Sequence, residues 1–292
     1  MHNHDGPSLS PTDLLRNPDG SVYHLAIPFG VLPKTIITVG DPDRVELVSR
    51  CFDAVEHRFG KREFVTHIGR IGSNQVAVVS TGIGTDNIDI ALQELDFLVN
   101  INPITAQSKQ PHTSLHIVRI GTTGALRPDL LPGSAIVSHG ATGFDTLMQF
   151  YQIPPGKQNV LQMDRELAET LLLDFTPYTV SATWGMLNVA AQRFAHPGHT
   201  ATCPGFYGPQ SRTTRLPLRH SLLDVLALAP ARAGLAFTNF EMETAGIFAL
   251  GALLGHCTAS ISLVVANRAT GKVAKDAQGQ MEALIEDVLG IL

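Results

Sequence analysis

Three glycine-bearing segments follow apolar runs of the kind that form buried strands. They read VGDPDR at residues 39–44, STGIG at 80–84 and RIGTTG at 119–124. Glycine at the carboxyl end of a strand lets a ligand approach the backbone, and the free N–H groups there can bind an anion. Glycine is also the usual residue of a plain tight turn, so each segment alone is a weak signal. Together they predict three turns that could surround an anion.

Two arginines beside these segments favour an anion site. Arg119 lies inside the apolar run LHIVRI, where a buried guanidinium is costly unless it meets an anion or pairs with a carboxylate. Arg44 falls in the first turn of a predicted helix, where its charge opposes the helix dipole unless an anion lies between them. With Gly40 and Thr122, these side chains supply what an oxyanion such as phosphate requires. The GTTGA segment lacks GxGxxG and a well-placed acidic residue downstream, which argues against a dinucleotide-binding fold.

Alternating strands and helices must position these segments. Strands are predicted at 35–39, 76–80, 115–120, 134–139, near 178–184 and at 258–266. Helices are predicted behind Pro42, at about 86–99, 164–174, 240–255 and 278–291. Residues 101–114 are polar and without a period, which predicts a loop or an insertion, and residues 1–20 predict a flexible N-terminal arm. This pattern indicates an α/β layered fold with a buried sheet, and no repeat or linker divides residues 21–292, so one domain is expected.

Composition limits the classes of function. The 292 residues are 44% hydrophobic and carry a net charge of −5, so there is ample core material and no basic field for nucleic acid or an anionic membrane. The start MHNHDGPSLS does not resemble a secretory signal, and the apolar stretch 245–255 is too short to span a bilayer. The three cysteines lack CxxC spacing, which fits a reducing compartment. We therefore expect a cytoplasmic protein that binds a small molecule.

Six strings together resemble the uridine phosphorylase branch of the nucleoside phosphorylase family. They are GDPDRV (40–45), STGIG (80–84), RIGTTGAL (119–126), FYGPQSR (206–212), NFEMETAG (239–246) and NR (267–268). The pattern F-Y-x-x-Q-x-R separates the uridine branch from the purine branch, and the resemblance covers nearly the whole chain after residue 20. It implies a single-domain, three-layer α/β/α sandwich around a mixed, partly barrel-like central sheet. It also implies a homodimer as the minimal unit, commonly assembled into hexamers.

The resemblance implies a role for each matching residue at the phosphate and the sugar. Phosphate would be bound by Gly40, Arg44, Arg119 and Thr122, joined by Arg62 of a neighbouring subunit. The ribose hydroxyls would be held by Glu243 with Thr122, Met242 and Glu241, and His24 would reach across the dimer interface to the 5′-hydroxyl. By residue type alone, Met242 would be a core residue and His24 an ordinary histidine. The histidines show no HExxH spacing, so a zinc site is not expected.

The same resemblance implies a base site and a cation site. The base would be bound by Thr123, Gly124, Phe206, Gln210 and Arg212, with Arg268 in support. Of all these residues, Arg119, Glu243, Gln210 and Arg212 would be catalytic. Part of the family holds a monovalent cation at the dimer interface, which would fall at Glu63, Ile83 and Asn87; Asn87 replaces the family's serine.

The expected reaction is the reversible phosphorolysis of uridine, or a related pyrimidine nucleoside, to uracil and ribose 1-phosphate. The segment SLVVANR (262–268) lacks the carboxylate with which the purine branch protonates its leaving base. Uracil spreads its charge onto carbonyl oxygens, so donors from Gln210 and Arg212 can stabilise it without a general acid. Inorganic phosphate would be the co-substrate, and no organic cofactor is needed. The alternatives are a hydrolytic nucleosidase, against which the three arginines weigh, and a nucleoside-binding protein without turnover.

Overall fold

The first half of the chain folds as its sequence pattern predicts. The computed structural model describes residues 8–153, 161–226 and 235–292. The β-branched run forms β1 (Thr35–Val39), and α1 (Pro42–Ser49) follows, with Pro42 in its first turn and Asp41 as its N-cap. The next such unit is β4 (Asn74–Ser80) followed by α2 (Thr85–Asn100), whose apolar residues share one buried face. Between the two units lies a hairpin that was not predicted, β2 (Ala54–Lys61) and β3 (Phe64–Ile71).

The second half contains the other predicted elements and several short ones. The predicted elements are β5 (His116–Ala125), β6 (Ala135–Gly143), α3 (Leu161–Leu171), β7 (Tyr178–Ser181), α6 (Thr244–Leu254), β10 (Cys257–Asn267) and α7 (Ala277–Leu289). The elements that were not predicted are η1 (Leu147–Phe150), α4 (Gly185–Ala191), β8 (Ala195–Thr202), η2 (Gly208–Gln210) and β9 (Asn239–Glu241). All of the missed elements have eight residues or fewer, and segments this short carry little hydrophobic period.

Two predictions are wrong, one about the GTTG segment and one about the start of the helix expected at 240–255. The GTTG segment is not a turn, because β5 continues to Ala125 while pairing with β10 on one side and with β9 near its end. The β10 ladder pairs one side of this segment along its whole length, while the β9 ladder on the other side begins only at Gly124. The helix predicted from residue 240 begins at Thr244, because residues 239–241 form β9 beside β8. Glu243 is therefore the N-cap residue and not an interior helix residue.

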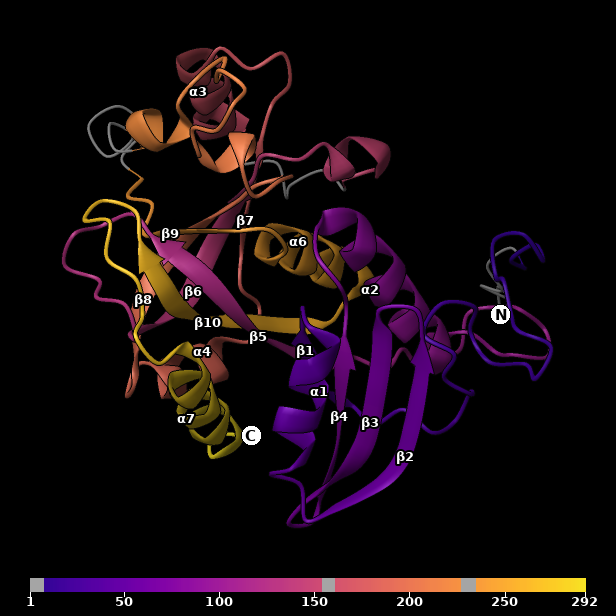
Figure 1. Ribbon diagram of the computed structural model, residues 1–292. Coiled ribbons are helices and arrows are strands. Elements are labelled where there is room, and N and C mark those ends of the chain that lie inside the picture. Colours follow the sequence, from indigo (N-terminus) through magenta and orange to yellow (C-terminus); the bar gives the residue numbers. More distant parts are fainter. Residues whose placement is uncertain (1–7, 154–160, 227–234) are drawn as a thin grey trace.

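The sheet is mixed and partly closed into a barrel. Its strand order is β10-β6-β8-β9-β5-β1-β4-β3-β2, and β10 also pairs with β5. These pairings close β5, β10, β6, β8 and β9 into a ring, from which β1, β4, β3 and β2 extend as an open sheet (Figure 1). β7 pairs with β6 outside the ring.

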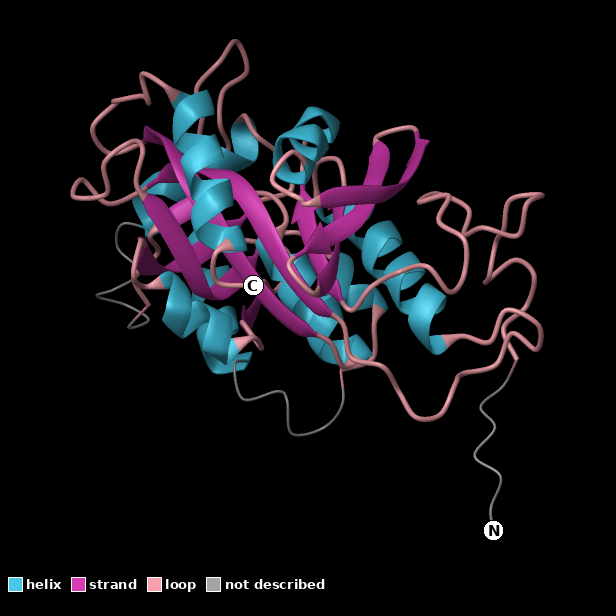
Figure 2. Cartoon of the chain, turned by 90° about the horizontal axis from the view of Figure 1, so that it is seen from below, coloured by secondary structure: helices cyan, strands magenta, loops and turns pink. Residues whose placement is uncertain are grey.

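Helices cover both faces of the sheet (Figure 2). Alternate residues of β1 point into different cores, since Ile36 packs in a cluster with α2 and α6 while Ile37 packs in a cluster with α1, α4 and α7. Both residues are completely buried. The predicted three-layer α/β/α arrangement around a mixed, partly barrel-like sheet is therefore confirmed.

Residues 8–20, expected as part of a flexible arm, pack against the 101–114 loop. Leu14 is buried, the Leu9 amide donates to the Ala106 carbonyl over 2.9 Å, and the Arg16 guanidinium donates to the Pro103 carbonyl. Residues 1–7 of the expected arm lie outside the described residues. Among the helices described, none is long and apolar enough to cross a membrane.

Candidate active site

A cavity of about 670 Å³ lies beyond the carboxyl ends of β1 and β4 and along β5. Its size is in the range of pockets that bind small molecules. It brings together most of the predicted site residues, namely Gly40, Arg44, Glu63, Ile83, Asn87, Arg119, Thr122, Thr123, Phe206, Gln210, Glu241, Met242 and Glu243. Five further residues complete its wall: Asp41, Pro42, Gly82, Phe240 and Val265.

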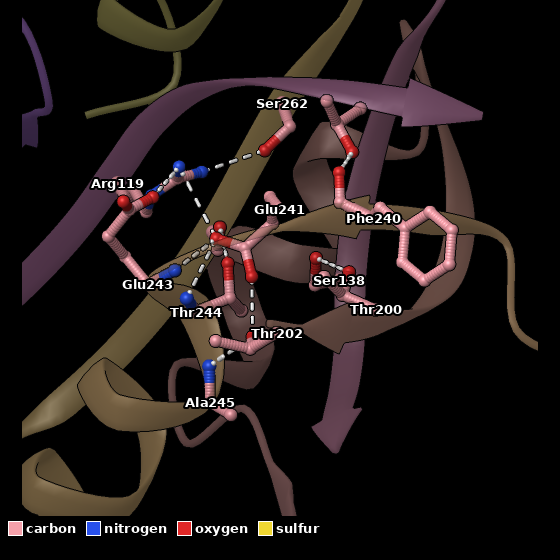
Figure 3. A network of polar contacts seen from close by, with 12 residues as sticks. Arg119, Ser138, Thr200, Thr202, Phe240, Glu241, Glu243, Thr244, Ala245 and Ser262 are labelled. Atoms are coloured by element: carbon pink, nitrogen blue, oxygen red, sulfur yellow. Dashed lines mark hydrogen bonds and ion pairs between the residues drawn. The ribbon is translucent and has the colours of Figure 1, made fainter. Parts of the chain in front are cut away.

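Three charged side chains that line this cavity, Arg119, Glu241 and Glu243, belong to one buried network of polar contacts (Figure 3). Arg119 donates through Nη2 to Glu243 Oε2 and lies 3.3 Å from Glu241 Oε2, while its Nη1 donates to Ser262 Oγ over 3.0 Å. The other Glu243 oxygen accepts from the Gly84 amide over 2.8 Å. Gly84 has φ +98°, a conformation that favours glycine and directs this amide at the carboxylate. Of the two partners that the sequence analysis considered for Arg119, the structure shows the carboxylates, and the guanidinium also lines the cavity.

Burial and mutual attraction set the protonation states of this network. Burial acts against the charged guanidinium of Arg119, yet the charges of Glu241 and Glu243 raise its pKa above the ordinary value. Burial raises the pKa of the Glu243 carboxyl, and the charge of Glu241 raises it further against the opposing effect of Arg119. Arg119 thus stays cationic beside the two buried acids.

Glu241 serves mainly to position its neighbours. Its Oε2 accepts from the amides of Glu243 and Thr244, each over 2.8 Å, so it satisfies free donors at the start of α6. Its Oε1 accepts from the Thr202 hydroxyl, which itself accepts from the Ala245 amide over 2.9 Å. Thr202 was not predicted as a site residue, because one threonine in an eight-residue strand carries no sequence signal.

Two other residues missed by the sequence analysis shape the position of Arg119. A Cβ atom at Gly121 would lie 1.8 Å from Arg119 Nη1, so only glycine leaves room for the guanidinium along β5. Ser262, on the adjacent strand β10, accepts from that same nitrogen. The i, i+2 spacing of Arg119 and Gly121, on one face of a strand, is a signal that could have identified the glycine.

The second arginine faces the first across the predicted phosphate site. Arg44 is half-buried, and one of its Nη atoms lies 3.5 Å from the Ile120 carbonyl oxygen. Burial lowers the pKa of the Arg44 guanidinium, and the positive charge of Arg119 lowers it further. Two partly desolvated cations with Gly40 and Thr122 beside them form a site that an anion would stabilise.

The end of the cavity that is predicted to bind the base is lined by Phe206 and Gln210 from the segment after β8, whereas Arg212 lines an adjacent pocket. The Arg212 guanidinium stacks 3.5 Å over the Phe206 ring and donates to Gln210 Oε1 over 2.8 Å. Arg268 donates to the Gln210 carbonyl over 2.9 Å, which fixes the backbone of a glutamine that is only 3% exposed. Burial, and then the charge of Arg268, lower the pKa of Arg212.

The predicted base-site residues Thr123, Gly124 and Arg268 contact other protein groups at this end of the cavity. Thr123 donates its hydroxyl proton to the Phe240 carbonyl and accepts from Asn239 Nδ2 over 2.8 Å. A Cβ at Gly124 would lie 3.3 Å from Arg268 Cγ, so Gly124 and Arg268 pack on each other behind the cavity wall.

His24 and Arg62 do not line the cavity of their own chain. His24 is held by Glu94, with Nδ1 and Oε1 2.7 Å apart. Arg62 is exposed, with φ +56°, in the turn between β2 and β3. The next residue, Glu63, accepts from Asn87 Nδ2 over 3.1 Å, and Ile83 is 67% exposed nearby, so the three residues predicted for a cation lie together.

One other group of side chains in the described residues resembles a metal site. Candidate ligand atoms of Asp96, His112 and His256 lie within 4.8 Å of one another. The Leu115 amide donates to His256 Nδ1 over 3.2 Å, which leaves the ring proton on Nε2, 3.3 Å from Asp96 Oδ1. Because a protonated nitrogen cannot ligate a metal, this tautomer of His256 argues against a metal site here.

Comparison with known proteins agrees with this geometry. Residues 34–290 match the model of the phosphorylase superfamily. Uridine phosphorylase of Thermococcus kodakarensis is 27% identical, covering 94% of this chain and 87% of its own length, and that of Treponema pallidum is 28% identical, covering 91% and 88%. A Trypanosoma brucei nucleoside phosphorylase described as showing uridine phosphorylase activity superimposes with a TM-score of 0.83 at 25% identity, covering 96% of this chain and 99% of its own. The chain belongs to the phosphorylase superfamily.

Proposed function

We propose that the protein is a uridine phosphorylase, a pentosyltransferase that converts uridine and phosphate reversibly to uracil and ribose 1-phosphate. The observation that carries this proposal is one cavity lined by the two arginines Arg44 and Arg119, the buried carboxylate of Glu243, and a glutamine, Gln210, that Arg212 holds in place. The similarity to uridine phosphorylases over about nine tenths of the chain supports it.

In this reaction the phosphate binds between Arg44 and Arg119, and the ribose lies above it with its hydroxyls donating to Glu243. A phosphate oxygen forms a bond to C1′ while the bond from C1′ to N1 breaks, and the electron pair leaves with the uracil. The sugar passes through an oxocarbenium-like state, which the negative phosphate below it stabilises. Gln210 and Arg212 stabilise the uracil anion until it takes a proton from water. These steps require no organic cofactor.

The preference for a pyrimidine rests on the segment 262–268, which has no carboxylate where the purine branch has its acid. Asn267 donates to the carbonyls of Arg127 and Leu130, and its oxygen accepts from the amides of Ala269 and Thr270. It is thus fully engaged in holding the loop after β10 and carries no proton for a leaving base.

The proposal includes an assembly and a location. His24 and Arg62, which lie outside the cavity of their own chain, would complete the site of a second copy in a homodimer, with hexamers as a further assembly. A monovalent cation at Glu63, Ile83 and Asn87 belongs to the same interface. The three cysteines form no disulfide, which supports a cytoplasmic enzyme of pyrimidine salvage and nucleoside catabolism.

The test is to incubate the purified protein with uridine, with and without phosphate, and to quantify uracil and ribose 1-phosphate. We expect both products only with phosphate, and little reaction with inosine. Uracil release at the same rate without phosphate would identify a nucleosidase, and binding of uridine without any uracil would identify a nucleoside-binding protein.

A further inference from the structure

His24 is fixed by an unusually complete set of contacts from one buried acid. Glu94 lies on α2 and is 7% exposed. Its Oε1 accepts from the His24 amide over 2.9 Å and from His24 Nδ1 over 2.7 Å. Its Oε2 accepts from the amides of His24 and Leu25 over 3.0 and 2.8 Å. The buried Glu94 carboxylate, which lies outside the cavity, thus holds the short segment that contains His24 and Leu25.

These contacts determine which ring nitrogen of His24 carries the proton. Backbone amides can only donate, so the carboxylate of Glu94 accepts from all three groups, and Nδ1 must be the protonated nitrogen. Nε2 of the neutral ring therefore keeps its lone pair. The side chain is 22% exposed and is flanked by the rings of Tyr23 and Phe64, at centroid distances of 4.8 and 6.2 Å.

The segment that carries His24 is also tied to the hairpin that carries Arg62. Lys61 donates to Asn17 Oδ1 over 2.8 Å and to the Tyr23 carbonyl over 2.7 Å, and its ammonium lies 3.7 Å from the centroid of the Tyr23 ring. Because Lys61 directly precedes Arg62, the two residues expected to reach a second copy are held on one surface.

The 101–114 loop anchors the beginning of the same segment. Ser8 Oγ donates to the Thr105 carbonyl over 2.8 Å, and the Arg16 guanidinium donates to the Pro103 carbonyl. The loop thereby gives the N-terminal segment a rigid support, and Glu94 fixes its far end.

We propose that Glu94 is a positioning residue of the active site, which fixes the orientation and tautomer of His24 so that Nε2 accepts a hydrogen bond from the ribose 5′-hydroxyl in a second copy's cavity. The proposal rests on the proposed function. Glu94 itself touches neither substrate nor reacting atoms, so it acts through His24.

The kinetic test compares uridine with 5′-deoxyuridine, which lacks the hydroxyl that His24 would contact. The native enzyme should prefer uridine by about tenfold in kcat/KM, the usual effect of one hydrogen bond. Glu94→Ala should reduce the preference for uridine over 5′-deoxyuridine to about onefold to twofold, and His24→Ala should do the same. The double variant should show no smaller preference than either single variant. The matched control is Asp96→Ala, on the same helix, whose carboxylate contacts Asn100 and His256 instead. It should keep the native preference, because general destabilisation affects both substrates equally.

A second variant tests the tautomer without turnover, should Glu94→Ala not fold. In Glu94→Gln the amide oxygen can serve the two backbone amides, and the NH₂ group then faces Nδ1, which forces the ring proton onto Nε2. Nitrogen-15 NMR of the His24 ring at pH 8 should show protonated Nδ1 in the native protein and protonated Nε2 in the variant. The same tautomer in both proteins, or an unchanged uridine preference in Glu94→Ala, would overturn the role of Glu94. Failure of the native protein to split uridine would instead overturn the proposed function.

Discussion

At the scale of single residues, the position of Arg119 depends on the absence of a side chain two residues later. The guanidinium lies along β5 in the space that a Cβ at Gly121 would occupy, at 1.8 Å from Nη1. In that space it meets Ser262, Glu241 and Glu243 together. A phosphate that binds Arg119 therefore binds a group whose direction is already fixed, which lowers the entropy lost on binding.

Replacing Gly121 by alanine should remove phosphate binding although no functional group is deleted. The added methyl must displace the guanidinium, so we expect kcat/KM for phosphate to fall roughly 100-fold, the loss that Arg119→Ala should also produce. Steady-state kinetics over a range of phosphate concentrations measures this. The control is Gly60→Ala, where the added Cβ would meet its nearest atom at 3.9 Å. Normal phosphate saturation in Gly121→Ala would show that Arg119 does not bind the anion.

At the scale of elements, Thr202 joins β8 to the start of α6. Its hydroxyl donates to Glu241 and accepts from the Ala245 amide, and Glu241 in turn accepts from the amides of Glu243 and Thr244. The helix that presents Glu243 is thus attached to the barrel by side chains from β8 and β9.

Thr202→Val should loosen this attachment. It leaves the buried Ala245 amide and one Glu241 oxygen without a partner, which costs about 1–3 kcal/mol of unfolding free energy. Urea denaturation followed by circular dichroism measures the change. Thr66→Val is the matched control, because Thr66 is equally buried in β3 and its hydroxyl has no hydrogen-bond partner. The control should be neutral or slightly stabilising; equal losses in the two variants would contradict the role given to Thr202.

Elements could be predicted from the sequence where a local period identifies them. The units β1-α1 and β4-α2 follow from β-branched runs, a proline in the first helical turn and an apolar face. The GTTG segment was misjudged because glycine favours turns locally, while its actual conformation depends on β10, more than 130 residues later. β9 has three residues and no period of its own, so the position of Glu243 before the helix could not be predicted.

The site residues were predicted at positions where the resemblance supplied a motif. Four of the residues in these motifs, Arg44, Arg119, Gln210 and Glu243, line one cavity, as expected. Thr202, Ser262 and Glu94 were missed, because a positioning residue is defined by its partner in space and any polar side chain of the right length can serve.

At the scale of the whole molecule, one half-buried histidine makes the stability of the fold depend on pH. His199 lies on β8, and its Nε2 is 2.9 Å from the hydroxyl of Thr142 on β6. Burial lowers the pKa of His199 to about 4. The folded protein then binds the proton less readily than the unfolded chain does, so stability is lost as the pH falls below about 6.5.

We expect the unfolding free energy to be about 2 kcal/mol smaller at pH 5 than at pH 8 through this residue alone. His199→Gln should lack that part of the pH dependence, whereas His196→Gln, at an exposed position of the same strand, should retain it. Urea denaturation of the three proteins at both pH values provides the measurement. An identical pH dependence in the native protein and His199→Gln would show that His199 is accessible to protons in the folded state.

The active site itself should extend over two copies of the chain. Arg62 is exposed and outside its own cavity, whereas Arg119 is buried within it, so in a twofold dimer each site would combine Arg119 of one copy with Arg62 of the other. Mixing inactive Arg62→Ala and Arg119→Ala subunits, after mild denaturation and refolding together, should therefore restore activity. Random pairing makes half of the dimers hybrid, and one of the two sites in each hybrid is intact, so about a quarter of all sites should recover. Mixing Arg119→Ala with Glu243→Ala is the control: both residues line the cavity of their own chain, so every site keeps one defect and no activity should return. If verified Arg62→Ala and Arg119→Ala hybrids are no more active than their parents, each cavity works alone and the phosphate is bound without Arg62.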